Sequence, residues 1–101
     1  MPAYIVFIRR RITDAGEMEI YKSKVGKAAE GHSLKPLVRY GAFDVLEGTS
    51  AEGAVVLEFA DMDAARRWYG SEAYQEASRH RRLGSDYDVI LLEGVAMEQA
   101  G

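Results

Sequence analysis

The chain opens with Ala3-Tyr4-Ile5-Val6-Phe7-Ile8, a run of β-branched and aromatic residues that predicts a β-strand. Apolar residues stand at odd and even positions alike, so we expect both faces of this strand to be covered. The segment Ala54-Val55-Val56-Leu57-Glu58-Phe59 has the same character except at Glu58. Together these two strands predict a sheet that is apolar on both of its faces.

Helices are expected in two places between the strands. Asp14 and Glu17 have the spacing of a capping box, and Gly31 is a plausible C-cap for the helix that follows. Asp61 and Ser71 are N-cap residues of two consecutive helices later in the chain. The first helix places an apolar stripe on one side, formed by Met18, Tyr21, Val25 and Ala28 or Ala29.

Two further strands complete the pattern. A second strand is expected over residues 37–40, with a bulge or bend at Gly41 and a continuation over 42–47. The turn formers at 48–53 predict a hairpin loop, and the last strand is expected over 89–93.

The order β-α-β-β-α-β predicts an α+β, ferredoxin-like sandwich with a four-stranded antiparallel sheet and helices on one face. Right-handed crossovers place the first and third strands in the centre. Because the helices cover only one face, the other face would expose a large apolar surface. We therefore expect a homodimer through the open sheet face, a dimeric α+β barrel. The sequence predicts one domain, residues 1–96, and a polar C-terminal tail, residues 97–101.

Composition excludes several classes of function. The 101 residues contain 13 Lys and Arg against 16 Asp and Glu, and the net charge of −3 gives no reason to bind nucleic acid or an anionic membrane. There is no cysteine, which fits a cytoplasmic protein, and no apolar run reaches the roughly 20 residues that cross a bilayer. We expect a cytoplasmic location.

Glu58 and Arg39 are the candidate catalytic residues. A carboxylate in an apolar central strand is costly to desolvate, and burial would suit it to act as a general acid or base. Arg39 would orient an anionic group of a substrate through paired hydrogen bonds. The alternative is that Glu58 and Arg39 form a salt bridge between adjacent strands and serve the structure alone.

Aromatic residues at helical spacing suggest a ligand pocket between the helices and the sheet. A core role explains such a stripe, but its hydroxyl groups also suit a planar or phenolic ligand. Arg81 would either point toward that cavity or lie in solvent. The candidate pocket residues are Tyr21, Trp68, Tyr69, Tyr74 and Arg81.

The two histidines do not predict a metal site. His32 and His80 each lack a second ligand at helical spacing, and His80 lies in the basic stretch 79–82. His80 is either a proton shuttle or part of a solvated helix face. We expect no metal and no cofactor.

The sequence resembles a small bacterial family, domain of unknown function 1330, of the dimeric α+β barrel superfamily. The resemblance runs from Pro2 to Gly94, and its main motifs are Val38-Arg39-Tyr40-Gly41, Val45-Leu46-Glu47-Gly48, Val56-Leu57-Glu58-Phe59 and Ala65-Arg66-Arg67-Trp68-Tyr69-Gly70-Ser71-Glu72-Ala73-Tyr74-Gln75. It implies the ferredoxin-like dimer.

Members of that superfamily include cofactor-free oxygenases, lactone isomerases and proteins that only bind ligands. The resemblance therefore implies two hypotheses. One is a cofactor-free enzyme, oxygenase-like or isomerase-like, that acts on a small aromatic or carboxylated metabolite. The other is a non-enzymatic dimer that binds a small molecule or takes part in a stress response.

Overall fold

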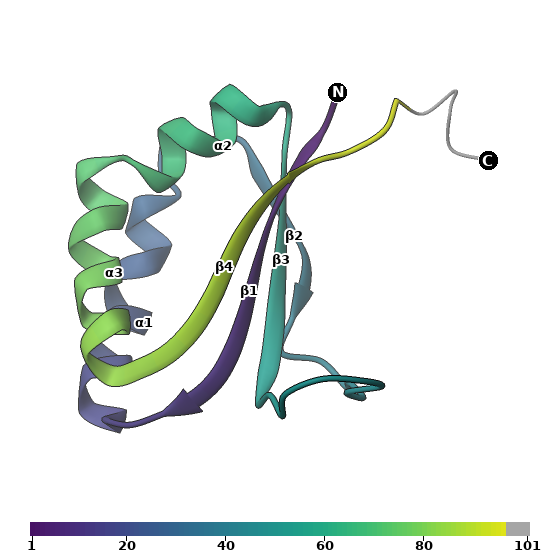
Figure 1. Cartoon of the computed structure of the whole chain (residues 1–101). Helices are drawn as coiled ribbons and strands as arrows, with labels where there is room; N and C mark the ends of the chain where they lie inside the picture. The colour runs from purple at the N-terminus through teal and green to yellow at the C-terminus, as the bar shows by residue number, and fades with distance from the viewer. Residues whose placement is uncertain (97–101) are drawn as a thin grey trace.

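The computed structural model describes residues 1–96 as a four-stranded sheet with three helices on one side (Figure 1). This α+β architecture confirms the predicted fold class. The expected polar tail, residues 97–101, lies outside the described residues. Within the described part, no helix has the length and apolar character needed to span a membrane. The elements are β1 (Ala3–Ile12), α1 (Ala15–Ala28), β2 (Leu34–Arg39), β3 (Gly53–Phe59), α2 (Met62–Tyr69), α3 (Glu72–Gly84) and β4 (Ser85–Glu93).

The strands lie in the order β2-β3-β1-β4, and each is antiparallel to its neighbour, so β1 and β3 are central as predicted. Ile5 is opposite Leu57, and both side chains are buried under the helices. Tyr4 is opposite Glu58, and alternation along the strands points these two to the other side. We call that side the open face; its residues are Tyr4, Val6, Ile8, Val38, Val56, Glu58, Ile90 and Leu92.

An aromatic cluster joins the sheet to α2 and α3. Trp68 of α2 and Tyr74 of α3 are 2% and 0% exposed, and their ring centroids are 4.1 Å apart. Phe59 and Phe7 pack on Trp68 from the sheet, with centroid separations of 5.6 and 6.4 Å. Burying each such side chain contributes about 1.5–3 kcal/mol, so this cluster is a main source of stability.

The predicted N-caps are present. The Asp14 carboxylate accepts hydrogen bonds from the backbone N–H groups of Gly16 and Glu17, and Asp61 and Ser71 cap α2 and α3. The predicted role of Glu17 in the capping box is wrong. Its carboxylate does not return to the start of α1 but lies 2.6 Å from Nδ1 of His80 on α3. Glu17 therefore connects two helices instead of closing the end of its own.

Two strands extend beyond the apolar runs that predicted them. β1 continues to Ile12 and β4 begins at Ser85. Here the ladder carries cross-strand ion pairs, Arg10 with Asp88 at 2.8 Å and Arg11 with Asp86 at 2.6 Å. Opposite charges on paired strands stabilise the pairing. The pairing of β1 with β4 therefore continues beyond the apolar residues that predicted each strand.

The predicted continuation of the second strand over 42–47 is wrong. β2 ends at Arg39, and Tyr40 has a φ of +52°, in the left-handed region that side chains other than glycine rarely adopt. The N–H of Tyr40 donates to the carbonyl of Ala54 at 2.8 Å. Because β3 begins at Gly53, it offers no residues for 42–47 to pair with, and the chain leaves the sheet.

The buried face of β1 can be tested with a matched pair of substitutions. We expect Ile5→Ala to lower the free energy of unfolding by about 2–5 kcal/mol, because Ile5 is 2% exposed and its removal leaves a cavity. Ile20→Ala on α1, where Ile20 is 39% exposed, should change it by less than about 1 kcal/mol. Urea denaturation measures both, and equal losses would contradict the assigned core.

Candidate functional site

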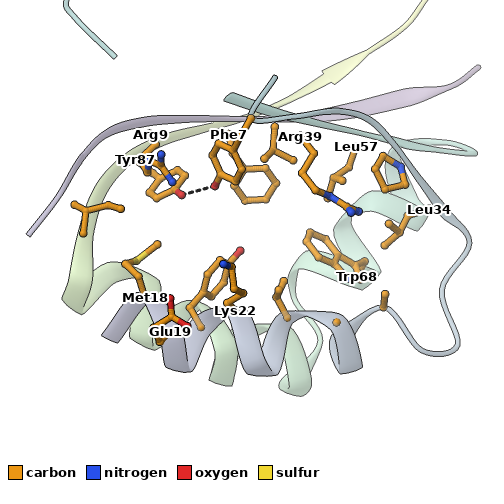
Figure 2. A pocket seen from close by; sticks show the side chains of 18 residues that line it. Phe7, Arg9, Met18, Glu19, Lys22, Leu34, Arg39, Leu57, Trp68 and Tyr87 are labelled. Carbon is orange, nitrogen blue, oxygen red and sulfur yellow. Dashed lines mark hydrogen bonds between the residues drawn. The ribbon is translucent and has the colours of Figure 1, made fainter. Parts of the chain in front are cut away.

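A cavity of about 540 Å³ lies between α1 and the helix-facing side of the sheet. Figure 2 shows Phe7 and Arg39 reaching into it from the sheet, Met18 and Lys22 reaching from α1, and Trp68 at one end. The walls also include Arg9, Ile12, Glu19, Tyr21, Val25, Gly26, Ala29, Leu34, Pro36, Tyr40, Val55, Leu57 and Tyr87. The lining is therefore mainly apolar and aromatic, with several cations.

The way α1 packs explains the cavity. α1 packs against α3, and its inward stripe includes Tyr21 and Val25, which are only partly buried. Of the residues in α1, Ala28 alone is fully buried. Gly26, and Ala29 just after the helix, line the cavity as well but carry too little side chain to fill the space below the sheet. The stripe that predicted a packed helix thus faces a hollow.

The charged groups around the cavity are mostly positive. Arg9 pairs with Glu52, with a separation of 3.5 Å between Nε and Oε1. Arg39 and Lys22 form no ion pair with any of the residues 1–96, and Glu19 is the one carboxylate among the lining residues. The cavity therefore offers two cations to an anionic ligand.

Tyr40 and Tyr87 form a wall that the sequence analysis missed. Their hydroxyl groups are hydrogen-bonded to each other (Figure 2), and the guanidinium of Arg9 lies 4.5 Å from the centroid of the Tyr40 ring. Burial, followed by the contact with Tyr40, raises the pKa of Tyr87. A Cβ atom at Gly53 would come within 2.9 Å of the Tyr40 ring, so only glycine fits there without displacing it. Gly53, the last of the turn formers at 48–53, was the one signal in the sequence that a large side chain packs closely at this point.

Tyr21, which is partly buried, and the fully buried Tyr74 and Arg81 form a polar group at the cavity. The hydroxyl oxygens of Tyr21 and Tyr74 are 3.1 Å apart, and burial is the main reason that the pKa of each is raised. Arg81 is 4% exposed and packs its guanidinium near the rings of Phe7 and Tyr87 at 5.9 and 5.3 Å. In the part of the chain that the structure describes, no carboxylate pairs with it, and its Nε atom has no hydrogen-bond partner.

The candidate pocket residues divide into three groups. Tyr21 and Trp68 line the cavity, and the buried indole N–H of Trp68 meets no acceptor among the described residues. Tyr74 and Arg81 lie behind the lining. Tyr69 instead borders a separate hollow of about 270 Å³ between α2 and the sheet, with Ile5, Arg66, Gly70, Val89 and Leu91.

The predicted salt bridge between Arg39 and Glu58 is wrong. Arg39 pairs in register with Val55, on the helix-facing side, and lines the cavity. Glu58 lies on the open face, between its register partners Tyr4 and Lys35. Burial and the nearby Glu58 carboxylate raise the pKa of Tyr4. The two candidate catalytic residues therefore stand on opposite sides of one sheet.

His80 lies away from the cavity. It is 9% exposed, and its contact with Glu17 joins α3 to the start of α1, which is a structural arrangement. Among residues 1–96, no three His, Asp or Glu side chains are grouped so as to hold a metal ion.

The sheet, the helix layer and the cavity define the class of protein: a small ferredoxin-like α+β protein with a hollow between its two layers. The chain belongs to the family described as a domain of unknown function (DUF1330), whose model matches residues 2–95. No curated protein matches the chain.

Solved structures show the same fold at low sequence identity. A protein of unknown function from Rhodopseudomonas palustris is 20% identical with a TM-score of 0.73, over 94% of this chain and 83% of that one. SnoaB, a cofactor-independent oxygenase from Streptomyces nogalater, is 13% identical with a TM-score of 0.56, over 97% and 96%. A dimeric ferredoxin-like protein of unknown function from Bacteroides fragilis is 10% identical with a TM-score of 0.54, over 92% and 96%.

The buried tyrosines give a test by alkaline titration. Because burial raises the pKa values of Tyr21, Tyr74 and Tyr87, these side chains stay neutral in the folded protein at about pH 10, where an unfolded tyrosine ionises. Their contribution to stability is complete below pH 10 and is lost as pH rises above it. Tyrosinate absorbance should therefore show fewer of the six tyrosines ionised near pH 10 in the folded protein than in urea. Identical curves would contradict the burial.

Proposed function

We propose that the protein binds a small planar aromatic compound bearing a carboxylate or phenolate in the cavity under α1. The observation that carries this proposal is the cavity itself: about 540 Å³, with aromatic walls and two cations that have no partner among the described residues. Ligand sites typically have about 300–1,000 Å³ and apolar walls with a few directional polar groups. An aromatic acid satisfies both features.

The arrangement of the lining suggests how such a ligand lies. Its ring would pack between Phe7 on the sheet and Tyr21 on α1, with Trp68 at one end. The indole N–H of Trp68 has no acceptor among the described residues but is itself buried, so a ligand oxygen would reach it only after a shift of the ring. Arg39 and Lys22 would hold the anionic group near the solvent, where both side chains are exposed.

We expect 1-naphthoate to bind and to quench the fluorescence of Trp68, which is the single tryptophan of the chain. Arg39→Gln should raise the dissociation constant about fivefold, the loss of one exposed charge contact. Arg67→Gln is the matched control, because Arg67 is exposed on α2 and does not line the cavity. Fluorescence titration measures all three, and equal affinity for 1-naphthoate and the neutral 1-naphthamide would argue against recognition of the anion.

A second candidate function, cofactor-free oxidation of the bound ligand, is favoured by the buried group Tyr21, Tyr74 and Arg81. A guanidinium that lacks a carboxylate partner in the described chain lies beside two hydroxyl groups that burial keeps neutral. The hydroxyl of Tyr21, which lines the cavity, would donate a hydrogen bond to a developing oxyanion. Tyr74, hydrogen-bonded to Tyr21, and the cation of Arg81 lie behind it and would support that hydroxyl. SnoaB, which shares the fold, is a cofactor-independent oxygenase. Glu58 takes no part in this proposal because it lies on the open face.

Oxygen uptake tests the second candidate. With anthrone, a ring CH2 group would become a carbonyl, one atom of O2 entering the product and the other leaving as water with the two hydrogens. We expect uptake above the uncatalysed rate, and a loss of about tenfold or more in Tyr21→Phe, which removes the hydroxyl that faces the cavity and little volume. Tyr69→Phe is the control, since Tyr69 borders the other hollow. Binding without uptake would leave the protein a ligand-binding module.

We also propose that two copies associate through the open face. Ile90 and Leu92 are 49% and 48% exposed, and they continue an apolar surface over all four strands. An apolar patch of this kind on a protein surface is often an interaction site. The Bacteroides fragilis protein of the same fold is described as dimeric. Sedimentation of the wild-type chain as a monomer at micromolar concentration would contradict the dimer.

A further inference from the structure

The segment between β2 and β3, residues 41–52, is here called the arm. Its alternating residues predicted a strand, yet the structure gives it no strand partner. Within residues 1–96, no backbone N–H from 41 to 51 donates to another backbone group. Phe43, Val45 and Leu46 are 49%, 43% and 90% exposed. The arm therefore has the composition of a paired, packed segment without the contacts that such a segment makes.

The base of the arm is fixed to the sheet. The N–H of Glu52 donates to the carbonyl of Arg9 at 2.7 Å, and the Arg10 guanidinium donates to the carbonyl of Thr49 at 3.1 Å. Figure 1 shows that the arm projects from the sheet on the side opposite to the helices. It thus stands beside the open face and is continuous with the surface proposed for dimerisation.

The area of the open face alone is small for a dimer interface. β1, β2, β3 and β4 have 10, 6, 7 and 9 residues, which cover a flat projection of about 500 Å² at about 3.3 Å per residue and 4.8 Å between strands. A stable protein interface typically buries about 800 Å² on each partner. The exposed apolar side chains of the arm would add to this contact surface.

We propose that the arm of each copy packs Phe43, Val45 and Leu46 on the open face of the second copy. The inference rests on the proposed homodimer and specifies which segment completes its interface. The second copy would cover apolar side chains that have no cover in the single chain.

Leu46→Lys tests the proposal without risk to the fold, because this side chain is 90% exposed in the single chain. We expect it to raise the dimer dissociation constant at least tenfold in sedimentation equilibrium, since each dimer loses two buried leucines. Leu83→Lys is the matched control. Leu83 is 58% exposed on α3, on the helix side, and its substitution should leave the constant unchanged.

A second variant, Ile90→Lys on the open face, separates the two proposals. If Ile90→Lys is monomeric and Leu46→Lys dimerises like the wild type, the arm proposal is overturned and the dimer stands. If the wild type is itself monomeric, both fail. If both variants dissociate while Leu83→Lys does not, the arm and the open face form one interface.

Discussion

The sheet is apolar on both faces, but a single layer of helices can cover only one of them. The rest of the structure follows from that constraint. α2 and α3 seal the sheet through the cluster around Trp68 and Tyr74. α1 packs on α3 and leaves a hollow beneath β2 and β3. The opposite face has no cover from the described chain. Because the helices do not cover the whole sheet, there is a cavity on one side of it and an exposed apolar surface on the other.

Polar groups concentrate where the covering is incomplete. Burying a guanidinium is costly unless other groups compensate for its lost hydration. Arg81 lies against the rings of Phe7 and Tyr87, and such cation–π contacts contribute about 0.5–2 kcal/mol. A cation held this way beside the Tyr21–Tyr74 pair keeps a capacity to interact with an anion, which distinguishes this group from an ordinary core.

Much of the fold could be predicted from the sequence, because apolar periodicity and capping residues are local signals. The strand order, the central position of β1 and β3 and the caps at Asp14, Asp61 and Ser71 all depend on such signals. The ion pairs that lengthen β1 and β4 join residues distant in the chain, and no local pattern shows them.

The site was harder to predict because it depends on which face of the sheet each residue of β2 points to. A bulge between Pro36 and Val38 adds one residue to β2 and moves Arg39 to the helix-facing side. Without that residue Arg39 would share the face of Glu58, as the sequence suggested. The wall of Tyr40 and Tyr87 was missed for a similar reason. It depends on the left-handed backbone of Tyr40, which places the Tyr40 ring against Gly53 of the neighbouring strand.

The central functional claim is that the cavity is a ligand site, and an NMR titration with 1-naphthoate tests it most directly. Because the chain has one tryptophan, its single indole N–H resonance reports on the cavity without ambiguity. The account predicts that this resonance and the backbone amides of Tyr21 and Arg39 shift together with one dissociation constant. Shifts confined to open-face residues such as Val6 and Ile90, with the indole signal unmoved, would contradict it.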